Sequence, residues 1–197
     1  MGQRGRKPKG KVKIRWSANF AYAIGLLVSD GCLSGGRHII LVSKDTEQLK
    51  NFMRALTIVV PIGETKSGYD RNISFKVQFS DVLFYDFLES IGLMPRKSKV
   101  IGEIKIPAEY FFDFLRGSFD GDGCTYSYWD PRWRSSFMFY TTFVSASGKH
   151  ISWLRSEIYK RLKIRGHMTG DGEKIIFQLK YAKADSLYQE DLKIIAN

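Results

Sequence analysis

The sequence has only two cysteines, Cys32 and Cys124, in 197 residues. Two such distant thiols are not a disulfide framework, and no Cys-x-x-Cys pair indicates a zinc site. We expect each cysteine to be a small buried residue at the start of a strand. The three histidines, His38, His150 and His167, are scattered, without the His-x-x-x-His spacing of a zinc enzyme. These absences exclude a disulfide-stapled scaffold, argue against a zinc nuclease and favour a reducing, intracellular setting.

Long apolar runs are also missing. No stretch is long enough to span a bilayer, and no apolar segment follows the basic N-terminus at the distance typical of a secretion signal. With 44% hydrophobic residues, the chain can still form a packed interior as one domain or as two small units. We expect no membrane partner, and the sequence leaves open a bacterial or archaeal cytoplasm or an organelle.

Acidic residues are absent from residues 1–15, which carry seven Lys or Arg. Of the formal net charge of +11, this segment leaves +4 for the remaining chain. Such a segment is too polar to pack, so we expect a flexible basic arm. Its expected partner is a polyanion, most plausibly nucleic acid, and the alternative is a solubility tail or an expression remnant.

What the sequence does contain is an internal repeat. Residues 20–32 read FAYAIGLLVSDGC and residues 112–124 read FDFLRGSFDGDGC, an offset of 92 residues. Further along, NISFKVQFS (72–80) matches KIIFQLKYA (174–182). The additional residues of the second copy fall after its motif, where a hairpin can accept them, as expected of a duplicated unit.

Each copy has the pattern of a helix, two strands, a helix, two strands and a helix. The first copy predicts a helix over about 17–31, a hairpin over 32–43, a helix over 44–57 and an alternating strand over 72–80. The predicted fold class is α+β, with two pseudo-symmetric αββαββα repeats whose antiparallel sheets form a DNA-binding saddle. The predicted divisions are a basic arm (1–15), a first repeat (16–91), a linker (92–107) and a second repeat (108–197).

Residues 23–31 (AIGLLVSDG) and 115–123 (LRGSFDGDG) resemble the two motifs of the LAGLIDADG homing endonuclease family. The second is a close match, whereas the first departs from the family at Ala23, Ile24 and Val28. Together with the pattern that follows each motif, the resemblance covers most of the chain. It implies a monomeric, intron-encoded, site-specific endonuclease that cleaves both DNA strands across the minor groove and leaves short 3′ overhangs.

The motifs also have a physical interpretation. Small residues recur at helical spacing, at Gly25 and Ser29 and at Gly117 and Gly121, so two helices could pair closely. Asp30 and Asp122 would then lie at adjacent helix ends, where two carboxylates disfavour each other unless a cation lies between them. Hard oxygen ligands suit Mg²⁺, with Ca²⁺ as a non-cleaving substitute and Mn²⁺ as an alternative. The competing interpretation is an Asp-Gly turn after each helix.

The resemblance implies further site residues. The backbone carbonyls of Ser29 and Gly121 would face the metals, while Asp120 would point toward structure. Lys44 matches a position where the family places a polar residue near the metal-bound water, whereas its counterpart, Ala146, cannot act there. The family often has a basic residue near the end of the last strand, for which the candidates are Lys183, Lys180 and Lys76. The expected catalytic residues are Asp30, Asp122, Lys44 and Lys183, although each lysine could instead be a solvated charge or a phosphate contact.

The polar strand faces are the expected surface for a long, loosely palindromic double-stranded DNA target, since Arg, Lys and Gln can bind base edges. The long aromatic hairpin over 124–144 would distinguish the second half-site, unless its tryptophans pack within the hairpin itself. The candidate contacts are Arg37, His38, Lys66, Arg71, Ser74, Lys76 and Gln78 in the first copy and Tyr126, Tyr128, Arg132, Arg134, Tyr140, Lys174, Gln178 and Lys180 in the second.

Three other functions compete with the nuclease. An RNA maturase that assists intron splicing could use the same scaffold, although the retained acids favour cleavage. A non-enzymatic DNA-binding regulator would need a helix-turn-helix, for which 197 residues leave no room. An intein would need a nucleophile at residue 1 and a His-Asn end, and the chain begins with Met1 and ends in Ala196-Asn197.

Overall fold

The structure, a computed structural model, describes residues 10–66, 73–133, 135–170 and 176–182. The first half contains α1 (Ala18–Ser29), β1 (Gly31–Ser34), β2 (His38–Ser43), α2 (Thr46–Leu56), β3 (Ile62–Lys66), β4 (Ile73–Ser80) and α3 (Val82–Ser90). The second half contains α4 (Phe111–Asp122), β5 (Cys124–Trp129), β6 (Phe137–Ser145), α5 (Gly148–Leu162), β7 (His167–Thr169) and β8 (Phe177–Ala182). Two short 3₁₀ helices, η1 (Lys97–Lys99) and η2 (Ala108–Tyr110), lie between the halves.

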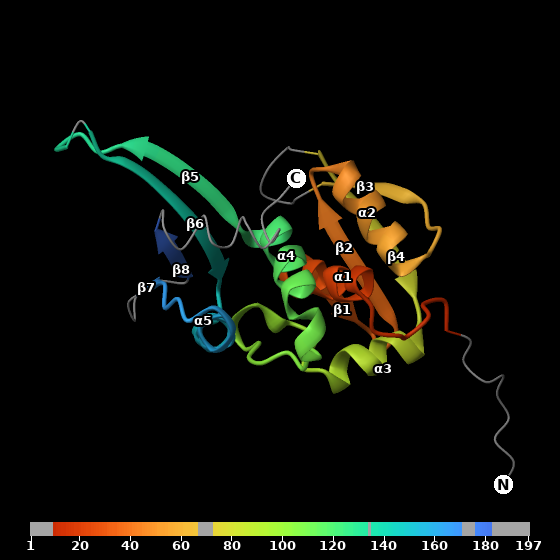
Figure 1. Cartoon of the computed structure of the whole chain (residues 1–197). Coiled ribbons are helices and arrows are strands. Elements are labelled where there is room, and N and C mark those ends of the chain that lie inside the picture. Colours follow the sequence, from red (N-terminus) through yellow and green to blue (C-terminus); the bar gives the residue numbers. More distant parts are fainter. Residues whose placement is uncertain (1–9, 67–72, 134, 171–175, 183–197) are drawn as a thin grey trace, which may run out of the picture.

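The two sheets have the same topology. Their strand orders are β1-β2-β4-β3 and β5-β6-β8-β7, and every pairing is antiparallel. Helices α1 and α4 contact each other between the sheets, and the β5–β6 hairpin extends away from the body (Figure 1). The predicted α+β fold with two antiparallel sheets is confirmed, while the helix expected to end the second repeat lies outside the described residues.

Side-chain caps define where the main helices begin. The Ser17 side chain accepts a hydrogen bond from the backbone N–H of Phe20 at the start of α1. Asp45 caps α2 and Ser147 caps α5 with their side chains, each two residues after the end of the second strand of its half. These residues satisfy N–H groups that have no partner within the helix, so equivalent positions in both halves turn the chain from strand into helix.

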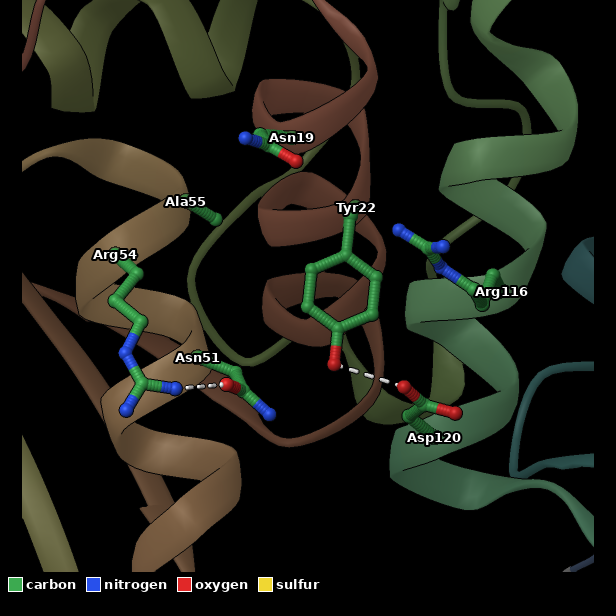
Figure 2. Close-up of a pocket in the computed structure, with 7 residues that line it drawn as sticks. All are labelled: Asn19, Tyr22, Asn51, Arg54, Ala55, Arg116 and Asp120. Carbon is green, nitrogen blue, oxygen red and sulfur yellow. Dashed lines mark hydrogen bonds between the residues drawn. The ribbon is translucent and has the colours of Figure 1, made fainter. Parts of the chain in front are cut away.

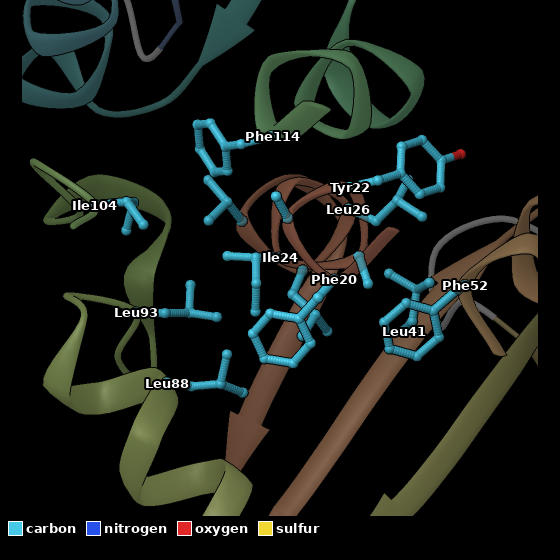
Figure 3. Packing of buried hydrophobic residues seen from close by; sticks show 14 of the residues in the cluster. Phe20, Tyr22, Ile24, Leu26, Leu41, Phe52, Leu88, Leu93, Ile104 and Phe114 are labelled. Atoms are coloured by element: carbon cyan, nitrogen blue, oxygen red, sulfur yellow. The ribbon is translucent and has the colours of Figure 1, made fainter. Parts of the chain in front are cut away.

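Helix α1 is the centre of the hydrophobic core and is buried continuously from Phe20 to Val28. Figure 3 shows its side chains surrounded by Phe114 of α4, by Leu41 of β2 and by Leu88 of α3. A helix that is apolar around its whole circumference is stable only when it is buried on all sides, and each large apolar side chain contributes about 1.5–3 kcal/mol. Among the described residues, no helix has the length and apolar character needed to cross a membrane.

The two cysteines were expected to be small buried residues at the start of a strand, and this expectation is wrong. Cys124 begins β5 and Cys32 lies in β1, but both are exposed free thiols. The reason is the strand alternation: Leu33 in β1 is buried, so the side chain of its neighbour, Cys32, points to the opposite face.

Candidate active site

The crossing of α1 and α4 depends on two glycines. A Cβ atom added to Gly25 would overlap the carbonyl oxygen of Phe114 and lie 2.6 Å from the backbone nitrogen of Ser118. A Cβ atom at Gly117 would overlap the carbonyl oxygen of Tyr22. The helices therefore meet backbone to backbone, which only glycine allows at these two positions.

The same crossing brings the helix ends together. A Cβ atom added to Gly121 of α4 would lie 3.0 Å from Oδ2 of Asp30, which directly follows α1. Asp122 is the last residue of α4. The Asp30 carboxylate thus reaches across to the end of the partner helix, and the two acids form one pair, called here the acid pair.

The electrostatics of the acid pair are unfavourable for two free carboxylates. Burial and then the charge of Asp122 raise the pKa of Asp30 to about 6, against an opposing effect from Lys97. Desolvation also raises the pKa of Asp122, although this residue is exposed at the mouth of the site. Partial removal from water disfavours the charged form of both groups, so a bound cation would stabilise the pair.

Lys97 of η1 carries the positive charge that lowers the pKa of both acids and so partly opposes the effect of burial. Its side chain is buried, with the residue 8% exposed, and its Nζ donates a hydrogen bond to the carbonyl oxygen of Ser29 over 2.8 Å. Burial lowers the pKa of Lys97, while the charges of Asp122 and Asp30 act in the opposite direction. Lys97 could not be identified from the sequence, because it lies in the irregular linker, where neither a motif nor a periodicity marks it.

A cleft of about 330 Å³ opens beside Asp122, one member of the acid pair. The ends of α1 and α4, the linker and the end of β6 line it, including Ser29, Lys97, Ser98, Asp122 and Ala146. Two carboxylates and nearby main-chain carbonyls are hard oxygen donors, the chemistry that Mg²⁺ prefers. Since the described residues contain no group of three or more His, Cys, Asp or Glu that could hold a metal, water and substrate phosphates would have to complete the coordination.

The lysines predicted from the sequence lie in different places. Lys44 is exposed in the turn between β2 and α2, and no hydrogen bond or ion pair connects it to either acid in the described part of the chain. Lys183 lies outside the described residues. Ala146, the counterpart of Lys44, lines the cleft beside Asp122, so the surroundings of the two acids differ.

Asp120 points away from the acid pair. Its Oδ2 accepts a hydrogen bond from the Tyr22 hydroxyl over 2.8 Å, and its backbone carbonyl accepts one from Gln48 of α2 over 2.7 Å. Figure 2 shows this carboxylate facing Tyr22 in a separate pocket between α1, α2 and α4, with Arg116 beside the ring. Asp120 therefore connects three helices, in agreement with a structural role.

The strand registers bring most of the candidate contact residues onto two open faces. Val42 pairs with Lys76, Ile40 with Gln78 and His38 with Ser80, so these side chains share one face of the first sheet. In the second sheet, Tyr126 pairs with Tyr140, and Thr142 with Lys180. Residues of the candidate set on these faces are His38, Ser74, Lys76 and Gln78, and Tyr126, Tyr128, Tyr140, Gln178 and Lys180.

The remaining candidate DNA contacts lie in turns, at the end of a strand or outside the described residues. Exposed Arg37 lies in the β1–β2 turn, where its Nε donates to Nε2 of His38 over 3.4 Å. Arg132 is held in the β5–β6 turn by hydrogen bonds to Asp130, with its Nη2 2.9 Å from Oδ2. The backbone of Lys66 ends β3. Arg71, Arg134 and Lys174 lie outside the described residues.

The two tryptophans of the long hairpin are largely exposed. Trp129 is 62% exposed and Trp133 is 69% exposed. Trp129 packs on its cross-strand partner in the same hairpin, Phe137, with the two ring centroids 5.1 Å apart. Both tryptophans are therefore largely exposed at the end of the β5–β6 hairpin, although Trp129 also packs within it.

Comparisons with solved structures show the fold. The chain aligns with the N-terminal LAGLIDADG domain of DUF199/WhiA at 18% identity and a TM-score of 0.56, over 92% of this chain and 83% of that one. It aligns with I-DmoI in complex with DNA and Mn at 12% identity and a TM-score of 0.56, over 91% and 97%. It also aligns with the I-LtrWI LAGLIDADG homing endonuclease bound to target DNA, at 11% identity and a TM-score of 0.56, over 90% and 82%.

The protein thus has the fold of LAGLIDADG domains. A scan against protein-family models and a search of curated protein sequences gave no match. The structural relatives include homing endonucleases and the WhiA domain alike. Because one fold hosts different functions, the function has to be argued from the site itself.

Proposed function

We propose that this protein is a site-specific double-strand DNA endonuclease whose acid pair, Asp30 and Asp122, binds Mg²⁺. The observation that supports this proposal is the convergence of both carboxylates at the α1–α4 crossing. Their raised pKa values indicate a pair that lacks sufficient positive charge. The crystal structures of I-DmoI and I-LtrWI on DNA support DNA as the partner.

In this proposal the two open sheet faces bind successive parts of one duplex. Lys76, Gln78, Gln178 and Lys180 would contact base edges or phosphates, and the basic arm would add phosphate contacts. The acid pair and the Ser29 and Gly121 carbonyls would hold metal ions beside the scissile phosphates. When bound, Mg²⁺ would activate water and stabilise the leaving 3′ oxygen.

A second candidate is a DNA-binding protein that does not cleave. The Lys97 ammonium already donates a hydrogen bond to the Ser29 carbonyl, which the metal site would use. The alignment with the WhiA domain also has the same TM-score, 0.56, as the alignment with I-DmoI. An RNA maturase on the same scaffold is the third candidate. All three bind nucleic acid through the open faces, and they differ in whether DNA is cut and in whether RNA is preferred.

One experiment separates these candidates. The protein is incubated with a random library of DNA duplexes in Mg²⁺ and in Ca²⁺, and the cut ends and the bound duplexes are sequenced separately. A nuclease gives one enriched target in both pools and Mg²⁺-dependent ends with short 3′ overhangs. Enrichment without cutting would support the non-cleaving candidate, and binding restricted to intron RNA in a parallel pool would support the maturase.

A further inference from the structure

The linker between the two halves inserts one side chain into the site. Lys97 of η1 is 8% exposed, and its Nζ donates to the Ser29 carbonyl over 2.8 Å. A buried ammonium needs acceptors and negative charge around it. Ser29, Asp30 and Asp122 supply both, so the lysine is held where the acid pair most needs a cation.

The backbone around Lys97 is anchored to the second half of the molecule. The Ser147 hydroxyl donates to the carbonyl of Ile101 over 2.5 Å, and Nδ1 of His150 lies 2.7 Å from the carbonyl of Gly102. The Ile101 side chain is buried. The linker is therefore fixed to the start of α5 in the second half. The Lys97 side chain extends from this linker to the end of α1 in the first half.

The residue before Lys97 has a costly backbone conformation. Arg96 lies in the left-handed region, with φ 54° and ψ 34°, which costs a non-glycine residue about 1–2 kcal/mol. Such strain persists only where the surroundings enforce it. It turns the chain so that Lys97 enters the cleft, while Ser98 and Lys99 stay exposed.

The Lys97 hydrogen bond competes with metal ligation. The Ser29 carbonyl is one of the oxygens that the proposed metal site would use, and an ammonium donating to it repels a divalent cation nearby. The charge of one lysine also neutralises only part of a pair of carboxylates. In the metal-free protein the Lys97 ammonium therefore has a hydrogen-bond acceptor, but the negative charge of the acid pair is only partly neutralised. This remaining charge favours replacement of the ammonium by a divalent cation.

We propose that Lys97 is the internal counter-cation of the acid pair, which holds the Ser29 carbonyl in the metal-free protein and leaves it when divalent cations bind. The inference depends on the proposed function, because it assumes metal binding at the acid pair. The inference also makes the linker part of the site. Movement of Lys97 on metal binding would shift η1 and, through the contacts of Ile101 and Gly102, the start of α5.

The test is a Ca²⁺ titration of the full chain, followed by NMR of the Gly31 and Gly123 amides beside the two acids, which detects even millimolar affinities. Lys97→Met keeps the length of the side chain and removes its charge. We expect this variant to bind Ca²⁺ roughly tenfold more tightly than the unmodified protein. The matched control is Lys99→Met, two residues along on the exposed side of η1, which should leave the affinity unchanged.

A second measurement uses the unmodified protein labelled with ¹⁵N-lysine and does not depend on the folding of a variant. The Nζ signal of Lys97 should move as Ca²⁺ saturates the site, while that of Lys99 should not. An unmoved Lys97 signal at saturation, or equal or weaker Ca²⁺ binding by folded Lys97→Met, would overturn the inference and leave the proposed function intact. No Ca²⁺ response at Gly31 or Gly123 in the unmodified protein would also overturn the inference, whereas the proposed function, in which substrate phosphates complete the coordination, is tested by the cleavage assay.

Discussion

The first and second sheets have the same strand order and the same antiparallel pairings, yet their open faces carry different chemistry. The face of the first sheet carries the polar side chains of His38, Lys76 and Gln78 beside the aliphatic Ile40 and Val42. The face of the second is aromatic: Tyr126, Tyr128 and Tyr140 stack with ring centroids 5.2–6.5 Å apart, and β5 is exposed along its whole length.

The paired helices differ much less than the sheets. Gly25 and Gly117 each meet the backbone of the opposite helix, and each helix ends at an acid. Close packing constrains both sides of a contact, whereas side chains on an open strand face contact only their neighbours on that face, such as the stacked tyrosines. The comparison indicates that the helix crossing fixes the shared scaffold, while the open faces are free to differ; in the proposed function they would bind two different half-sites.

The largest expected effect is the loss of cleavage when either acid is neutralised. Asp30→Asn or Asp122→Asn should each reduce the rate of double-strand cleavage roughly 10³-fold or more, because the metal site loses a charged ligand. DNA affinity in Ca²⁺ should change little. Single-turnover cleavage and a binding assay on the same target measure the two quantities.

Asp120→Asn is the matched control for these variants, since it lies on the same helix but bonds to Tyr22. It should retain cleavage within about tenfold. If either acid variant cleaved at the unmodified rate, the equivalence of the two helix ends would be broken. If all three variants lost activity equally, the loss would not be specific to the acid pair.

The next effect concerns stability. Gly25→Ala and Gly117→Ala should each lower the free energy of unfolding by about 2–4 kcal/mol, because the added methyl group forces the helix backbones apart. Urea denaturation measures the change. Gly102→Ala is the control, since a Cβ atom there meets nothing within 4 Å, and its loss should stay below about 0.5 kcal/mol. Similar stability for all three variants would contradict the close crossing.

Each of the two open sheet faces should bind its own half of the DNA target. Lys76→Ala should weaken binding about tenfold and relax sequence preference only in one half of the target, and Lys180→Ala should do so only in the other half. Binding to duplex libraries randomised in one half-site at a time measures this. Relaxation of both halves by one substitution would show that the two sheets do not bind separate half-sites.

The smallest effect is a pH dependence of the metal-free protein. The pKa of Asp30 is raised from 3.8 to about 6 in the folded chain, so its stabilising contribution is complete below about pH 4 and is lost as the pH rises through 6. The free energy of unfolding in EDTA should fall by on the order of 1 kcal/mol over this range, allowing for solvent screening.

Asp30→Asn provides the comparison for this pH series. It removes the titrating group while keeping a similar shape, so the slope between about pH 4 and 7 should decrease. An unchanged slope would mean that another group carries the dependence, and the raised pKa would then not be a property of the acid pair.

Much of the fold could be predicted because the duplicated segments have clear periodicities. The small residues of α1 and α4 indicated close pairing, and the alternation of 73–80 indicated a half-buried strand. The error on Cys32 shows the limit of reasoning from residue type. Its preference for burial is weaker than the alternation set by the buried Leu33.

The site was less predictable than the fold. Lys97 lies in a linker without periodicity, and its position depends on contacts from α5 that are distant in sequence. Lys44 was expected to act near the metal-bound water, but in the described part of the chain no hydrogen bond or ion pair connects it to either acid. Its side chain lies in an exposed turn and is not positioned by packing. Local patterns thus identified the acids at the helix ends but not the cation that tertiary structure brings to them.

The central claim is that the acid pair gathers divalent cations over bound DNA. The most direct measurement is the anomalous scattering of Mn²⁺ in crystals of the protein with a duplex that it binds. We predict a peak at about 2.0–2.2 Å from carboxylate oxygens of Asp30 and Asp122, facing the DNA backbone. Mn²⁺ peaks elsewhere with none at either acid, or acids turned away from the duplex, would contradict the account.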